Sequence, residues 1–123
     1  MGWLGRFRRG SGGRLPPLGR SDGPGMDIDL AAVRAHLTDF ATTRRGVEAY
    51  VEPGTNVTAT TIVLVATDGE WTRRAVRDPR AAYDLAQSIG IPVYDVLRTG
   101  YPPRMREWSS RQRRSNEREG GGR

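Results

Sequence analysis

Residues 60–76 read TTIVLVATDGEWTRRAV, and this stretch decides the fold of the 123-residue chain. The run Ile62–Ala66 is apolar on both faces of a strand, which predicts a central position in a sheet. Asp68-Gly69 separates this run from a second β-rich segment, Glu70–Val76, and an Asp-Gly pair between two such segments predicts a hairpin. A two-residue turn there predicts three opposite pairs: Ala66 with Trp71, Leu64 with Arg73, and Ile62 with Ala75.

The segments on either side of the hairpin complete an α+β pattern. Upstream, apolar residues recur at helical spacing over residues 30–41, and residues 47–51 alternate as a half-buried strand that Pro53-Gly54 ends. Downstream, Asp78-Pro79 begins a helix, and residues 93–98 form a last strand. The order α-β-β-β-α-β predicts a four-stranded mixed sheet with two helices on one face. The third strand, second helix and last strand are expected to form a right-handed parallel crossover.

The basic charge of the chain lies outside this domain. Residues 1–26 contain five arginines and one aspartate, a net charge of +4, and residues 104–123 contain seven arginines and three glutamates, also +4. Residues 27–103 contain eight arginines and ten carboxylates, which leaves −2. Composition therefore predicts an α+β domain at 27–103 between disordered basic tails at 1–26 and 104–123. Met26 directly precedes the first helix and is a second candidate translation start.

Several kinds of chemistry lack the residues that they need. The chain has one histidine, His36, and no cysteine, so a usual zinc site is excluded. The glycines of residues 10–13 precede any strand, and no Gly-x-Ser-x-Gly turn is present. The element order matches the core of PD-(D/E)XK nucleases, but the second strand has no carboxylate and the chain has no lysine. We therefore expect no metal, no cofactor and no catalytic residue.

Arginine and aromatic side chains are suited to phosphate contact and stacking, and they form the candidate binding residues. The candidate surface of the domain consists of Trp71, Arg73, Arg74, Arg77, Tyr94, Tyr101, Arg104 and Arg106. The candidate contacts of the C-terminal tail are Arg111, Arg113, Arg114 and Arg118. The alternative interpretation places Trp71 in the core and pairs the arginines of the domain with Glu48, Glu52 or Asp95 across strands.

Four motifs cover much of the chain between residues 39 and 108. They are RGVEAYVEP at 45–53, GEWTRR at 69–74, GIPVYDV at 90–96, and Gly100-Tyr101-Pro102 followed by Arg104-Met105-Arg106. This set resembles a family of small uncharacterised actinobacterial proteins. Members of that family have no established activity, and some carry an automatic oxidoreductase label that no motif in this sequence supports.

The sequence favours a cytoplasmic, non-catalytic binding or adaptor domain. Its arginine tails are expected to give weak, nonspecific affinity for RNA, DNA or another anionic polymer. The alternatives are a small enzyme, either the labelled oxidoreductase or a degenerate nuclease relative, and an oligomeric protein. In the last case an open sheet face would bind a protein partner or a second copy. No integral membrane association is expected, because the longest apolar run is far shorter than a membrane span.

Overall fold

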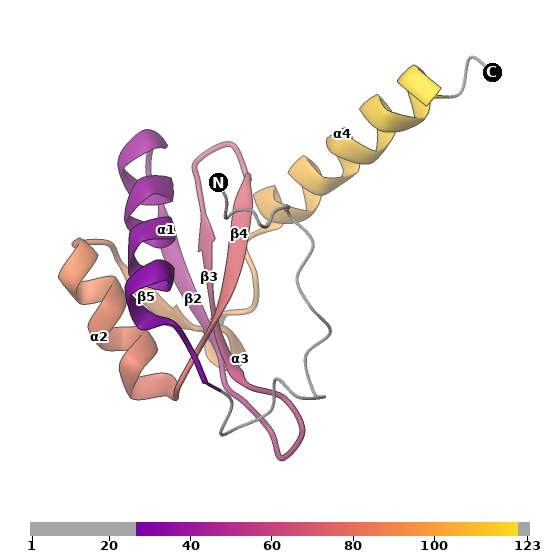
Figure 1. The fold of residues 1–123 in the computed structure, drawn as a ribbon. Coiled ribbons are helices and arrows are strands. Elements are labelled where there is room, and N and C mark those ends of the chain that lie inside the picture. Colours follow the sequence, from indigo (N-terminus) through magenta and orange to yellow (C-terminus); the bar gives the residue numbers. More distant parts are fainter. Residues whose placement is uncertain (1–26, 121–123) are drawn as a thin grey trace.

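The computed structural model describes residues 27–120, and the N-terminal tail prediction at 1–26 lies outside the described residues, as do residues 121–123. The elements in chain order are α1 (Leu30–Thr43), β2 (Glu48–Glu52), β3 (Thr60–Val65), β4 (Trp71–Val76), α2 (Pro79–Ile89), β5 (Val93–Asp95), α3 (Val96–Thr99) and α4 (Pro103–Gly120). The strands form one sheet in the order β4-β3-β2-β5, and α1 and α2 lie together against one face (Figure 1). The α+β fold, the four-stranded mixed sheet and the shared helix face are confirmed.

The two long helices of the domain each begin at an aspartate that acts as the N-cap residue. The Asp29 carboxylate accepts a hydrogen bond from the backbone N–H of Ala32 at 3.0 Å, and Asp78 accepts one from Ala81 at 2.8 Å. Helix α2 ends at Gly90, whose φ of 90° is a left-handed conformation that favours glycine. The chain therefore fixes where these helices start and stop through local contacts.

The main core lies between the sheet and the helices α1 and α2. All six residues of β3 are buried, which confirms the predicted central strand. The residues buried in this core are Leu37, Phe40, Val47, Ala49, Val51, Ile62, Leu64, Ala66, Val76, Ala82, Leu85 and Ala86. Burial of so many aliphatic side chains, at about 1.5–3 kcal/mol for each large one, is the main stabilising term for the domain.

The hairpin between β3 and β4 differs from the prediction by one residue. Val65 lies opposite Trp71 and Val63 opposite Arg73, so the predicted register is wrong. The reason is a three-residue turn: Gly69 N–H donates to the Ala66 carbonyl at 2.9 Å, and Ala66 N–H donates to Glu70 at 2.8 Å. Because a one-residue slip reverses the faces of a strand, Trp71 lies on the sheet face opposite α1 and α2.

Strand β5 is shorter than predicted, and its pairing partner, which the sequence did not predict, is β2. It ends at Asp95, whose carboxylate accepts from Leu97 N–H at 2.9 Å and so begins the short helix α3. It pairs in parallel with β2, with Tyr94 beside Tyr50, and not with β4. Strands β4 and β5 still run in the same direction, since two antiparallel steps lead from β4 to β2. The connection through α2 is thus a parallel crossover that spans two strands.

The second sheet face is covered at its centre, so the predicted open face is wrong there. Tyr50, Val63 and Val65 are buried on this face, and Val96 of α3 and Met105 of α4 pack against them. The prediction of a disordered C-terminal tail is also wrong for residues 104–120, which belong to α4. A proline in the first helical position and a run of arginine, glutamate and glutamine favour this helix.

Candidate nucleic-acid interface

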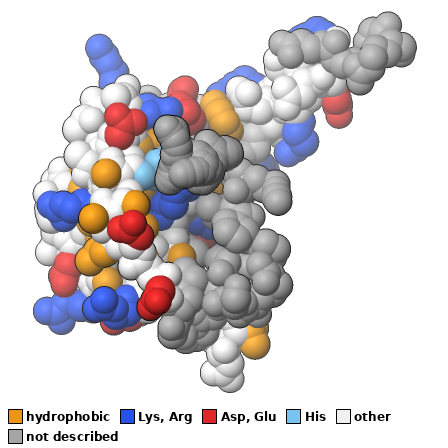
Figure 2. All heavy atoms as spheres, viewed as in Figure 1, with side chains coloured by type: hydrophobic (Ala, Val, Ile, Leu, Met, Phe, Trp, Pro, Cys, Tyr) orange, Lys and Arg blue, Asp and Glu red, His pale blue; other side chains and the backbone are white. Residues whose placement is uncertain are grey.

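Helix α4 carries half of the exposed arginines of the described chain within a single element. It leaves the sheet near the β3–β4 turn, and its C-terminal half extends away from the domain (Figure 1). Over residues 103–120 the six arginines Arg104, Arg106, Arg111, Arg113, Arg114 and Arg118 outnumber three glutamates and leave a charge of +3. Blue side chains follow this projecting helix in Figure 2. The net positive charge of the described residues is therefore concentrated on one extended element.

The N-terminal turns of α4 are held on the sheet by polar contacts and by Met105. The indole Nε1 of Trp71 donates to the Ser109 hydroxyl at 3.0 Å. Nε of Arg104 donates to the Ala66 carbonyl at 2.9 Å, and Arg111 donates to the Asp68 carbonyl at 2.8 Å. These contacts fix residues 104–111, which we call the root of α4, against the end of the β3–β4 hairpin.

Arg104 is occupied by the domain itself. Its guanidinium lies 2.7 Å from Glu48 Oε1, which also accepts from the Tyr50 hydroxyl at 2.9 Å. The hydrogen bond from Arg104 lowers the pKa of Glu48. Burial, together with the bond to Glu48, raises the pKa of Tyr50 to about 12. Both groups keep their ordinary charge states at neutral pH, and the ion pair offsets the charge of Arg104.

Glu52, the last residue of β2, accepts contacts from several polar side chains on the second sheet face. Nε and Nη2 of Arg73 lie 3.0 and 3.1 Å from its two carboxylate oxygens. The hydroxyls of Thr61 and Tyr101 also donate to Glu52. The Arg73 guanidinium lies 5.4 Å from the centre of the Trp71 ring. Arg73 is thus paired within the domain, as the alternative interpretation of the sequence expected.

The remaining residues of the candidate surface are dispersed. Tyr94 is 37% exposed beside Tyr50, with ring centres 5.4 Å apart, and Tyr101 is 42% exposed. Arg77 is exposed in the link between β4 and α2, and Arg106 is exposed on α4. The structure therefore brings Trp71, Arg73, Tyr94, Tyr101 and Arg104 to one sheet face and leaves the other members elsewhere.

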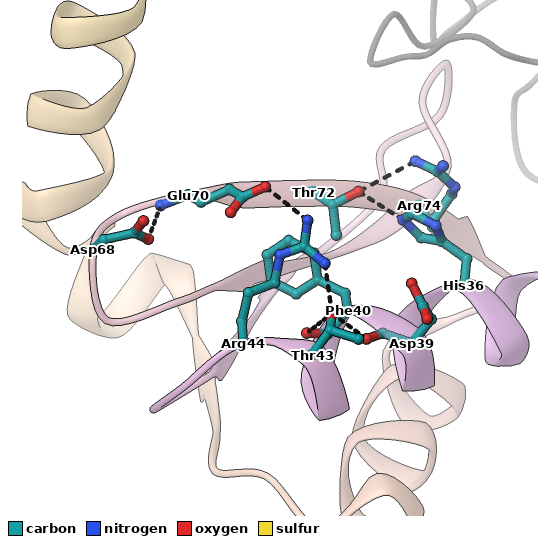
Figure 3. Close-up of polar contacts among 9 residues, drawn as sticks. All are labelled: His36, Asp39, Phe40, Thr43, Arg44, Asp68, Glu70, Thr72 and Arg74. Atoms are coloured by element: carbon teal, nitrogen blue, oxygen red, sulfur yellow. Dashed lines mark hydrogen bonds and ion pairs between the residues drawn. The ribbon is translucent and has the colours of Figure 1, made fainter.

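Arg74 lies on the helix side of the sheet, against α1 (Figure 3). It donates to the Thr72 hydroxyl at 3.4 Å, and His36 Nε2 lies 2.8 Å from the same oxygen. Burial, and next the charge of Arg74, lowers the pKa of His36 to about 4. Burial also lowers the pKa of Arg74. This cluster joins α1 to β4 and is separate from α4.

The exposed arginines of α4 form two stripes. At 100° per residue, Arg111, Arg114 and Arg118 share one side of the helix because they are three and four residues apart. Arg106 and Arg113 are seven residues apart and form a second stripe, with Ser110 between the two. A shallow depression of about 380 Å³ is lined by Arg106, Glu107, Ser110, Arg111 and Arg114. Within the described chain, Arg104 is the one arginine of α4 within 4.0 Å of a carboxylate.

Sequence reasoning missed the helical form of this segment and the contacts at its root. Ser109 and the carbonyl oxygens of Ala66 and Asp68 were not identified as partners, because their contacts join segments far apart in the chain. A usable signal was present: Pro103 is followed by Met105 and Trp108, which are three residues apart.

In residues 27–118, no three His, Cys, Asp or Glu side chains gather where they could hold a metal ion. Over the same part of the chain, no helix is long and apolar enough to cross a bilayer. Comparison with protein-family models, with curated proteins and with solved structures finds no match. The family resemblance of the four motifs accordingly stays a prediction.

Proposed function

We propose that this protein is a non-catalytic nucleic-acid-binding module in which α4 supplies the binding surface. One observation carries the proposal: a preformed helix holds five exposed arginines, none of them paired with a carboxylate of the described chain. These are Arg106, Arg111, Arg113, Arg114 and Arg118. The domain at 27–102 has net charge −2 and holds the root of this helix.

The closely spaced guanidinium groups of α4 are suited to binding the phosphates of a nucleic acid. Arginine stays charged at all physiological pH values and offers paired N–H groups to phosphate oxygens. Each phosphate that is neutralised releases a counterion and contributes about −0.9 to the log–log slope of affinity against salt. Five arginines therefore account for a slope of about −4 to −5, with a dissociation constant of roughly 10⁻⁴–10⁻⁶ M at physiological salt.

The sheet face is a poorer phosphate site than α4. Arg73 and Arg104 are bound to Glu52 and Glu48, so each guanidinium is offset by a carboxylate. A phosphate would have to displace these carboxylates and leave them partly buried without partners, which costs free energy. The proposal also places the protein in the cytoplasm, where nucleic acid is available and a chain without cysteine suits the reducing conditions.

The test is a fluorescence-anisotropy salt titration with a labelled oligonucleotide. The binding variant replaces Arg111, Arg114 and Arg118 with glutamine, which preserves helix propensity. The matched control replaces Arg45, Arg80 and Arg98, three exposed arginines of the domain, and so removes the same charge elsewhere. We expect the first variant to flatten the salt slope by about 2–3 and the control to keep nearly the full slope.

Two results would contradict the proposal. Equal loss of binding in the two triple variants would show that net charge, and not α4, governs affinity. Absence of binding by the full chain even at low salt would remove nucleic acid as the ligand, and a protein partner would then be the better hypothesis.

A further inference from the structure

We infer that α4 binds in the major groove of B-form DNA, an inference that rests on the nucleic-acid-binding function proposed above. The helix is already formed and extends beyond the domain (Figure 1). An α-helix with its side chains is about 10–12 Å across, which matches a major groove about 12 Å wide. The side of α4 that faces away from the sheet can therefore enter a groove while the domain stays outside the duplex.

The two arginine stripes match the two walls of such a groove. Their mean directions differ by roughly 120° around the helix axis, from 100° per residue. One stripe holds Arg111, Arg114 and Arg118, and the other holds Arg106 and Arg113. The direction midway between the stripes points away from the side where Met105 packs on the sheet. If the side of α4 midway between the stripes faces the base edges, each stripe lies beside the phosphates of one DNA strand.

The residues between the stripes set the degree of sequence recognition. Ser110 lies between them and accepts a hydrogen bond from Arg113 at 3.0 Å, and Glu117 lies two turns further on. A serine hydroxyl can donate to or accept from several base edges and distinguishes them poorly. The helix therefore holds DNA through its phosphates and reads little sequence.

The other nucleic-acid forms fit α4 less well. Proteins hold single strands by stacking bases on exposed aromatic rings. The one aromatic residue of α4, Trp108, lies on the domain side, where its Cβ approaches Gly69. Tyr94 lies on the sheet beside Tyr50, and Tyr101, in the link between α3 and α4, is bound to Glu52. Duplex RNA is excluded by shape, because its major groove is too deep and narrow for a helix.

The test compares four ligands of one sequence and length: a DNA duplex, its isolated strand, an RNA duplex, and a DNA duplex with glucosylated hydroxymethylcytosine. The RNA duplex keeps a high density of phosphates but closes the major groove, and the glucose fills that groove without removing phosphates. We expect the full chain to bind the plain DNA duplex roughly tenfold or more tightly than each of the others, a difference of about 1.4 kcal/mol or more.

A pair of neutral substitutions tests the orientation of the helix. Ser110→Phe places a ring between the arginine stripes, whereas Gln112→Phe places the same ring on the opposite side of α4. We expect Ser110→Phe to weaken binding to the DNA duplex severalfold and Gln112→Phe to leave it unchanged. Circular dichroism of both variants checks that α4 stays helical.

The outcomes separate this inference from the proposed function. If RNA duplex or single strand binds as tightly as DNA duplex, and the glutamine variant at 111, 114 and 118 still loses affinity, the groove inference fails and the function stands. If the chain binds none of the four ligands, or that variant binds like the full chain, the proposed function fails as well.

Discussion

Gly69 and Arg104 touch through their backbones: a β-carbon added to Gly69 would lie 2.0 Å from the carbonyl oxygen of Arg104. Gly69 also has a φ of +96°, a conformation that strains any residue with a side chain. One glycine therefore both closes the β3–β4 turn and allows the backbone of the root of α4 to pack closely against that turn. The direction in which the arginine helix leaves the domain depends on this contact.

Replacing Gly69 with alanine should destabilise the domain by about 1–3 kcal/mol, from backbone strain and from collision with α4. The matched control is Gly90→Ala, since Gly90 has a φ of +90° with nothing within 4 Å of the added β-carbon. Urea denaturation measures the loss of unfolding free energy in both variants. Both share the backbone strain, so any additional loss in Gly69→Ala comes from the contact with α4. Faster amide hydrogen exchange at residues 105–109 is expected for Gly69→Ala alone; equal behaviour of the two variants would refute the contact.

Replacing Glu52 with glutamine should lower stability by about 2–3 kcal/mol. The change leaves the Arg73 guanidinium, 28% exposed, without its carboxylate and weakens the bonds from Thr61 and Tyr101. Asp84→Asn breaks the exposed pair with Arg80 and should cost less than about 0.5 kcal/mol. Chemical denaturation at neutral pH measures both, and similar losses would show that the Glu52 network contributes nothing beyond a surface ion pair.

The stability of the domain should fall with acid through His36. Its pKa is lowered from 6.5 to about 4, so the unfolded chain binds a proton in that interval and the folded chain does not. The contribution of neutral His36 is therefore complete above pH 6.5 and is lost progressively toward pH 4. Because His36 is partly exposed, the slope should stay below the one-proton limit of about 1.4 kcal/mol per pH unit.

The variant His36→Gln isolates this effect from the titration of the carboxylates. Thermal unfolding of both proteins is measured across the same pH interval. We expect the full chain to lose stability relative to His36→Gln as the pH falls from 6.5 to about 4. Equal changes of stability with pH in the two proteins would show that His36 does not titrate in that interval.

Deleting residues 112–123 should separate binding from stability. Residues 112–118 make no hydrogen bond or ion pair with the described chain outside α4, so the melting temperature should change little. The deletion removes Arg113, Arg114, Arg118 and Arg123, and DNA affinity should fall steeply. Differential scanning calorimetry and anisotropy on the same samples give both values. A large fall in melting temperature would mean that the distal half of α4 supports the fold.

Local sequence was sufficient for the helix ends and the central strand. Asp78-Pro79 and Gly90 act through contacts within a few residues, and the apolar run Ile62–Ala66 needs only burial to become a central strand. The hairpin register was not available from the sequence. Asp68-Gly69 fits both a two-residue and a three-residue turn. The three-residue form brings Ala66 and Gly69 against Arg104, which is more than thirty residues away in sequence.

The candidate site was predicted in its residue types but not in its shape. Arginine content pointed to residues 104–123, and the structure orders 104–118 into stripes that only a helix produces. Composition alone suggested disorder, because the segment has few apolar residues. Met105 reverses that outcome by packing on Tyr50, Val63 and Val65 of the second sheet face.

The pairing of β5 with β2 also orders events in time. Strands β2, β3 and β4 follow one another along the chain and pair with near neighbours, so they can assemble early. The pairing of Ala49 with Val93 can form only later, after α2 has carried the chain across two strands to the position of β5. Since α3 docks beside this late pair and α4 follows α3 in the chain, the arginine helix is expected to be the last element to be placed. During synthesis, a partly emerged chain can thus hold a nearly complete sheet before α4 has left the ribosome.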